Sequence, residues 1–296
     1  MATSLTAAVG RHARLVLGRA LPAELVDDRF ELWPGGESGT EPGNEPAGFG
    51  AALATVGSDP VGFLGGSVTL GRLQLDGLID PRLANPDDVL ARLYDALRPT
   101  IGATGARWLE LWGRPARPWH ESLAHREQMA PFRALHQMRC PLPLAVDPVP
   151  TRSYRPDRDL DAVRAVNNRA FAHHPDQGAK TAADLRAIMA EPWFRPDGLR
   201  IYERDGRMAG FCWTKIHSDP DPARRLGEIY VIGVDPDFHG QGLGGPMTAA
   251  GLQWLSAQGI TTGMLYVEAD NEPAVRIYLR LGFTTVRTDR AWEARL

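Results

Sequence analysis

Four glycines, Gly240, Gly242, Gly244 and Gly245, lie within six positions, shortly after the apolar run of residues 231–234. A β-type run that leads into glycines and then into a helix leaves backbone N–H groups unblocked at the helix N-terminus. These N–H groups and the positive end of the helix dipole together bind phosphate. The stretch therefore predicts an anion-binding loop. The alternative is a loop that only turns tightly.

Three kinds of phosphate ligand use such a loop. A nucleotide-binding P-loop ends in Gly-Lys-Ser/Thr, whereas this loop ends in Gly-Gly-Pro. A dinucleotide fold requires G-x-G-x-x-G, which Gly240, Gly242 and Gly245 supply, with Glu268 near the place of the ribose-binding acid. However, residues 235–239 separate the apolar run from the first glycine, and the preceding strands read as a hairpin. The dinucleotide fold stays the weaker alternative to a third ligand, the diphosphate of coenzyme A.

The elements around the loop follow from periodicity. Residues 159–171 and 181–190 have helical spacing, and Thr181 with Asp184 forms a capping box. Asp205-Gly206 is a two-residue hairpin turn between two β-type runs. Further on, the patterns indicate a strand, a helix with its proline in the first turn, a strand, a helix and a last strand. The second half is therefore predicted to fold as α-α-β-β-β-α-β-α-β, a mixed sheet.

Five prolines between Cys140 and Asp157 predict an extended connector. At 296 residues the chain is long enough for two domains, expected at 1–146 and 147–296. A gapless offset of 155 residues places Leu111 on Tyr266 and suggests a duplicated domain. The first copy is expected to be degenerate, because "RLANPDDVL" occupies the place of the glycine loop.

Composition limits the partners. A net charge of −3 does not favour nucleic acid or an anionic membrane, both of which require a basic face. Cys140 and Cys212 lie far apart without metal-type spacing, so a reduced cytoplasmic protein without a metal site is expected. A monomer is the expected state.

His239-Gly240-Gln241-Gly242-Leu243-Gly244 resembles the loop Gln/Arg-x-x-Gly-x-Gly/Ala of the GNAT acetyltransferase superfamily. The order of elements agrees with that superfamily, as does a helix that starts at Asn271 after a strand. His239 departs from the usual first residue, although its backbone N–H is still present. The resemblance implies two tandem GNAT acyl-CoA N-acyltransferase domains that use acetyl-CoA.

The chain also resembles the mycothiol synthase family, actinobacterial enzymes with tandem GNAT folds. The matching segments are "HQMRCPL", "HHPDQG", "WTKIH", "GEIYVIGVDP" and "LYVEADNEPAVRIYLRLGF". This resemblance implies that acetyl-CoA acetylates the cysteinyl amine of a cysteinyl-glucosaminyl-inositol, the last step of mycothiol synthesis. The match covers essentially all of the second half and only thinly the first.

The resemblance also implies the site residues. Glu228 would be the base that deprotonates the amine, and Tyr278 the acid that protonates the leaving thiolate. The residues implied to bind acetyl-CoA are Ile232, Gly233, Val234, His239, Gly240, Gln241, Gly242, Leu243, Gly244, Gly245, Asn271 and Arg276. Those implied to bind the acceptor are Asp176, Lys215, Glu228 and Tyr266. Asp176 stands where the family usually has Glu.

Two other functions are compatible with the sequence. The same acyl transfer could act on another amine metabolite, such as an aminoglycoside. The loop could also belong to a non-catalytic acetyl-CoA sensor, in which neither Glu228 nor Tyr278 acts.

Overall fold

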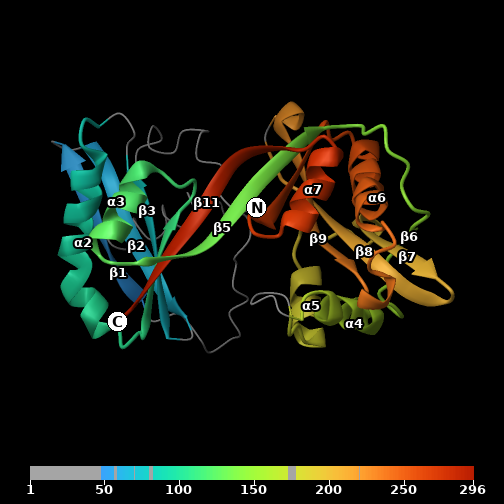
Figure 1. Ribbon diagram of the computed structural model, residues 1–296, viewed down its shortest axis with the longest axis horizontal. Helices are drawn as coiled ribbons and strands as arrows, with labels where there is room; N and C mark the ends of the chain where they lie inside the picture. Colours follow the sequence, from blue (N-terminus) through green and yellow to red (C-terminus); the bar gives the residue numbers. More distant parts are fainter. Residues whose placement is uncertain (1–47, 57–58, 70, 80–82, 173–177, 220) are drawn as a thin grey trace. The chain divides into compact units, whose positions relative to one another are not determined.

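The computed structural model describes residues 48–296 except 57–58, 70, 80–82, 173–177 and 220. These residues divide into two compact units (Figure 1). The C-terminal unit comprises the described residues of His136–Val286, and the N-terminal unit comprises those from Gly48 to Leu135 together with Arg287–Leu296. The domain boundary expected near Val146 stays a prediction.

The C-terminal unit is a mixed sheet with helices on both faces. Its strands are the end of β5 (Ala130–Pro141), β6 (Arg152–Ser153), β7 (Leu199–Arg204), β8 (Arg207–Ile216), β9 (Leu226–Val234), β10 (Thr262–Glu268) and the start of β11 (Thr284–Arg295). Its α-helices are α4 (Leu160–Ala170), α5 (Ala182–Met189), α6 (Gly244–Ala257) and α7 (Glu272–Arg280). Short 3-10 turns are η2 (Pro196–Gly198), η3 (Pro222–Arg224) and η4 (Pro236–Phe238). This order confirms the predicted mixed α/β fold.

Strand order in this unit is β5-β10-β9-β8-β7-β6. β9 and β10 run parallel, whereas β8 is antiparallel to both β9 and β7. Helix α4 packs on one face of β8 and β9, and α6 packs on the other. Figure 1 shows α4 and α5 together on one side of these strands and α6 and α7 on the opposite side.

Local sequence signals account for several of these elements. The Thr181 hydroxyl accepts the Asp184 N–H at 3.1 Å, and the Asp184 carboxylate accepts the Thr181 N–H at 2.7 Å, which confirms the capping box. Asp205 and Gly206 have φ of 53° and 71°, the left-handed values that a two-residue hairpin turn requires. The Asn271 side chain accepts the Ala274 N–H at 3.2 Å and so starts α7.

The N-terminal unit has a similar element order in its described part. Its elements are β1 (Gly48–Val56), β2 (Asp59–Thr69), β3 (Arg72–Ile79), α2 (Pro86–Ala103), β4 (Trp108–Gly113), α3 (Pro118–Arg126), the start of β5 and the end of β11. The sheet order is β1-β2-β3-β4-β11, with β3 and β4 parallel. Leucines of β3, β4 and α2 form the centre of its core. No helix of the described residues is long and apolar enough to cross a membrane.

Candidate active site

The predicted site lies where β9 and β10 stop pairing. Their ladder runs from Leu226–Thr262 to Ile229–Leu265, and no described residue of β10 pairs with β9 beyond it. On the other edge of β9, Val231 faces Trp213 but Ile229 faces Thr214, which leaves Tyr230 as an extra, bulged residue. A bulge bends its strand and increases the local twist. The parallel pair therefore opens at Tyr230.

Beyond the bulge, the free edge of β9 presents backbone groups. The Asp235 N–H donates to the Ala209 carbonyl at 2.9 Å, so residue 235 points its amide towards β8. Successive residues of a strand point their amide groups to opposite edges. Val234 and Ile232 therefore direct their N–H and C=O groups away from β8, to the edge that β10 leaves open.

The glycine loop follows this edge. Gly240 and Gly242 have φ of 75° and 73°, which other residues rarely adopt. A Cβ at Gly244 would lie 2.9 Å from Cδ1 of Ile277, so a larger residue would push α6 away from α7. No described residue accepts a hydrogen bond from the N–H groups of residues 240–245. Unpartnered amides at the start of α6 form a cradle for an anion.

Side chains around the loop have partners that sequence reasoning did not foresee. The ring nitrogen Nε2 of His239 lies 2.9 Å from the Val234 carbonyl oxygen, and donates to it. Arg204 donates to the Gln241 side-chain oxygen and to the Tyr202 hydroxyl, and no described carboxylate pairs with it. A cation with only neutral partners beside an anion cradle is available to a phosphate.

Two other residues of the predicted coenzyme set are engaged within α7. Arg276 forms an exposed ion pair with Glu272 at 2.8 Å. The side-chain oxygen of Asn271 caps the helix. Neither contact tests a role in coenzyme binding, so both roles stay predictions.

The predicted acceptor residues gather on the α4 face of the sheet. Lys215 and Glu228 are direct cross-strand neighbours, and both are buried. Tyr266 follows Met264, the β10 partner of Glu228, by two residues and so faces the same side. Its hydroxyl accepts a hydrogen bond from Gln137 at 2.6 Å. Asp176, the fourth member of the set, lies outside the described residues.

Lys215 and Glu228 each have a defined environment. The Lys215 Nζ lies 4.5 Å from the ring centre of Trp193 and 5.5 Å from that of Tyr230, so cation–π contacts hold the ammonium. The Oε2 atom of Glu228 lies 2.9 Å from Nε2 of His217. His217 directly follows β8 and lies two residues after Lys215, and this spacing was the signal that would have found it.

Tyr278 lies on the opposite face, in the cluster that α6 and α7 form with the sheet. It is 8% exposed and packs against Phe283 with ring centres 5.8 Å apart. Burial raises the pKa of the Tyr278 phenol, and the neighbouring Cys212 thiol raises it further. Tyr278 therefore remains a protonated phenol at neutral pH.

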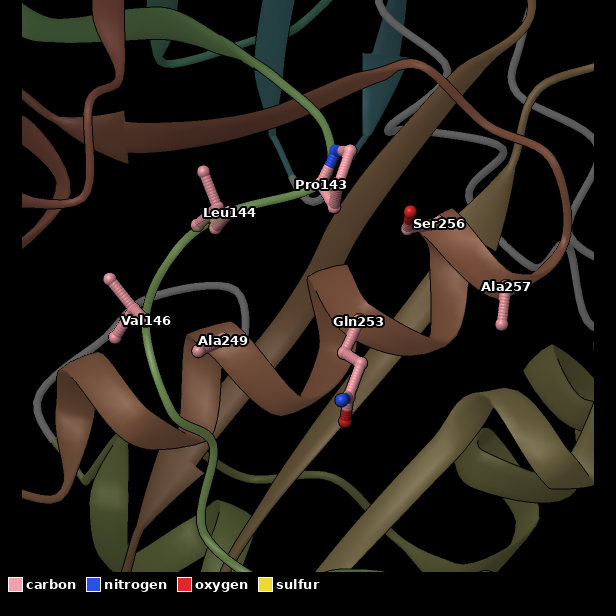
Figure 2. A pocket seen from close by; sticks show the side chains of 7 residues that line it. All are labelled: Pro143, Leu144, Val146, Ala249, Gln253, Ser256 and Ala257. Atoms are coloured by element: carbon pink, nitrogen blue, oxygen red, sulfur yellow. The ribbon is translucent and has the colours of Figure 1, made fainter.

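A hollow of about 320 Å³ lies elsewhere on this unit, between the segment after β5 and the outer surface of α6. Figure 2 shows Pro143, Leu144 and Val146 on one side of it and Ala249 and Gln253 of α6 on the other. None of the predicted site residues lines it. The described residues hold no group of three or more His, Cys, Asp and Glu that could bind a metal ion.

Comparisons with known proteins agree with this geometry. Residues 162–283 match the model of the Acetyltransferase (GNAT) family. A GCN5-related N-acetyltransferase from Sphaerobacter thermophilus superposes with a TM-score of 0.68 at 18% identity, covering 99% of this chain and 91% of its own. A tandem GNAT protein from the clavulanic acid biosynthesis pathway superposes with a TM-score of 0.58 at 16% identity, covering 85% and 84%. At these identities the structures show the fold alone.

The sequence relatives are closer. A mycothiol acetyltransferase from Streptomyces bingchenggensis is 45% identical over 63% of this chain and 65% of its own length. One from Thermomonospora curvata is 47% identical over 63% of each chain. The chain thus spans a little under two thirds of these relatives, but 76% of one from Streptomyces avermitilis, to which it is 45% identical. The chain therefore belongs to the mycothiol acetyltransferase family, within the GNAT superfamily.

Proposed function

We propose that this protein transfers the acetyl group of acetyl-CoA to the cysteinyl amine of a cysteinyl-glucosaminyl-inositol. One observation carries the proposal: the free edge of β9 leads, through residues 235–239, to the amides of residues 240–245, which have no acceptor in the described part of the chain. An extended arm that ends in a diphosphate fits such an edge and cradle together. Acetyl-CoA has this shape and carries an activated thioester at the far end of its arm.

The donor would bind along β9. Ile232, Gly233 and Val234 would pair with the pantetheine arm as an added strand, and the amides of residues 240–245 would hold the diphosphate. The His239 N–H already donates to the Pro236 carbonyl at 3.1 Å, so His239 would contribute through its side chain. The N–H of Val234 points to the same open edge, and would donate to the oxyanion that forms when the thioester carbonyl is attacked. Asn271 and Arg276 would contact the coenzyme from the start of α7.

The chemistry would use one group from each face of the sheet. An amine is largely protonated at neutral pH, so Glu228 would remove its proton before attack, directly or through a water molecule. Collapse of the tetrahedral intermediate breaks the carbon–sulfur bond and expels the CoA thiolate. Tyr278 would supply the proton, because its phenol stays protonated in its buried environment.

The acceptor would lie on the α4 face. Lys215, Tyr266 and Asp176 would hydrogen-bond the hydroxyl-rich glucosamine and inositol rings, and Glu228 would meet the amine. The burial of Lys215 and Glu228 favours tight, oriented contacts in this position. The relatives from Streptomyces and Thermomonospora are mycothiol acetyltransferases, which supports acetyl transfer in mycothiol synthesis.

Incubation of the protein with acetyl-CoA and the cysteinyl pseudodisaccharide tests the proposal. Free CoA and an acceptor heavier by one acetyl group are expected, with CoA detected by a thiol reagent and the product by mass spectrometry. The same pseudodisaccharide without its cysteinyl group is the control and should stay unmodified. If the acetyl group were transferred to an aminoglycoside but not to the cysteinyl compound, the aminoglycoside would become the proposed acceptor. Acetyl-CoA binding without transfer to any amine of a panel would indicate a sensor.

A further inference from the structure

We propose that His217 is a positioning residue that fixes the Glu228 carboxylate for proton abstraction. This inference deepens the proposed function and rests on it. It is based on the contact of 2.9 Å between Nε2 of His217 and Oε2 of Glu228. It joins two side chains on one face of neighbouring strands.

The backbone sets this contact. Lys215 pairs with Glu228, and Ile216 pairs with Gly227, so His217 continues β8 just beyond its last paired residue. The His217 N–H donates to the Leu226 carbonyl at 2.9 Å, which holds the start of the β8–β9 connection against the start of β9. The imidazole therefore reaches Glu228 from a fixed point. It does not depend on a mobile loop.

The contact leaves one carboxylate oxygen for the substrate. Within the described part of the chain, His217 is the only hydrogen-bond partner of the Glu228 carboxylate. An ionised carboxylate accepts hydrogen bonds only, so Nε2 of His217 must carry the proton in this contact. Oε2 is then occupied and oriented, and Oε1 is directed to the amine. A base whose rotamer is locked by a neighbour loses less freedom at the moment of proton transfer.

Burial of both side chains strengthens the contact that orients the Glu228 carboxylate. The side chains of His217 and Glu228 are 16% and 7% exposed, so little water competes for the contact. Lys215 on β8 and Tyr266 on β10 lie on the same face of the sheet as Glu228, on the two neighbouring strands. Without His217, the carboxylate would be free to turn towards the Lys215 ammonium. Glu228 would then be aimed away from the amine.

Kinetics of two variants separate positioning from folding. His217→Phe removes the donor, and His217→Gln keeps an N–H donor close to the position of Nε2. For His217→Phe we expect kcat to fall by roughly tenfold to a hundredfold, less than the loss of the base itself, with the KM for acetyl-CoA unchanged. His217→Gln should recover most of that loss. His125→Gln, on an exposed position of α3, is the control and should behave as the wild type.

A second measurement needs no acceptor. The ¹⁵N NMR shifts of histidine-labelled protein report which ring nitrogen carries the proton. We expect Nε2 of His217 to carry a proton in the wild type, and its shift to change in Glu228→Leu, where the hydrogen bond to the carboxylate is lost. A failed acceptor assay of the wild type would count against the proposed function and leave this result readable. The inference would be overturned by an Nδ1–H form in the wild type, by normal kcat in His217→Phe, or by equal losses in both His217 variants.

Discussion

At the scale of single residues, the site combines side chains that already have partners within the protein with groups that are available to a ligand. Lys215 is held by two aromatic rings, and Glu228 by His217. In contrast, the amides of residues 240–245 lack acceptors among the described residues, and Arg204 has only neutral partners. The contacts of the first set fix the orientation of Lys215 and Glu228, whereas the second set can bind a negatively charged group of a ligand. Substitutions in the two sets should therefore change different kinetic constants.

The first prediction concerns Glu228→Gln. The amide keeps the shape of the carboxylate but cannot take up a proton, so kcat should fall roughly a hundredfold or more, the usual contribution of a general base. Affinity for acetyl-CoA, measured by calorimetry, should stay near that of the wild type. Unchanged turnover across pH 6–9 would remove Glu228 from the mechanism.

The second prediction concerns Arg204→Gln. Its guanidinium lies at the glycine loop and has no carboxylate partner among the described residues, so its removal should weaken acetyl-CoA binding by about fivefold to tenfold, about 1–1.4 kcal/mol. The loss should shrink at high salt, because salt screens an exposed charge. Arg207→Gln on the same hairpin is the matched control, since Arg207 already pairs with Asp237 at 2.6 Å. Equal losses in both variants would contradict a specific role for Arg204.

At the scale of elements, turn and cap chemistry was readable from the sequence. The capping box of α5, the Asp205-Gly206 hairpin and the Asn271 cap of α7 each depend on a few neighbouring residues. The bulge at Tyr230 was not readable, because it arises from the pairing of β9 with β8. That bulge decides where β9 and β10 separate. The contacts of His217, His239 and Arg204 likewise depend on strands that meet only in the folded chain.

The repeat at offset 155 shows the same limit. Leu111 belongs to the core that faces α2, whereas Tyr266 points away from α6, the helix that follows β9. The offset therefore places residues of opposite sheet faces on each other. A slip of one residue along a strand reverses every side chain. The element order supports a tandem fold, but the gapless alignment does not hold at Leu111 and Tyr266.

The third prediction tests the packing of α6 on the sheet. A Cβ at Gly251 would lie 2.4 Å from Sγ of Cys212 and 2.9 Å from Cδ1 of Ile229, so Gly251→Ala should destabilise the protein by roughly 1–3 kcal/mol. Gly245→Ala in the same helix is the control, because its Cβ would meet Ile277 at 3.9 Å. Chemical denaturation measures both. If Gly251→Ala were as stable as Gly245→Ala, α6 could move away from the sheet without a loss of unfolding free energy, and the prediction would be wrong.

The fourth prediction concerns pH and the start of α3. Burial lowers the pKa of His120 to about 4, and its Nδ1 accepts the Arg117 N–H at 3.1 Å. Between about pH 6.5 and 4 the unfolded chain binds a proton that the folded chain does not, so stability is lost as the pH falls through this window. The loss should approach roughly 3 kcal/mol. His120→Gln should lack this part of the decline between pH 7 and 5, and an identical slope in both proteins would contradict the assignment.

At the scale of the whole molecule, the two units have similar element orders but differ at the loop that matters. The segment between β3 and α2 contains no glycine, and the first turn of α2 carries Asp87 and Asp88. Exposed carboxylates at that helix start repel an anion. The mixed α/β fold was predictable because each element of the C-terminal unit has a strong local pattern. The sequence contained no comparable signal for the sharing of β11 between the units.

The fifth prediction follows from this difference. Titration calorimetry should detect about one acetyl-CoA per chain, and Gly242→Ala, which forces a φ of 73° on a residue with a Cβ, should weaken that single site. Two equivalent tight sites would contradict the expected degeneracy of the first domain. Loss of all binding heat in the wild type would contradict the coenzyme cradle itself.

The position of β11 in the sequence sets the order in which the sheets of the two units can be completed during synthesis. Its residues pair with β4 from Arg290 opposite Gly113 to Arg295 opposite Trp108. A ribosome makes β4 long before it makes β11, so the nascent N-terminal half must wait with one sheet edge bare. An unpaired edge invites wrong pairing with other chains. The C-terminal half can complete its own sheet first, and the β4 edge of the N-terminal half is covered only after residues 290–295 have been synthesised.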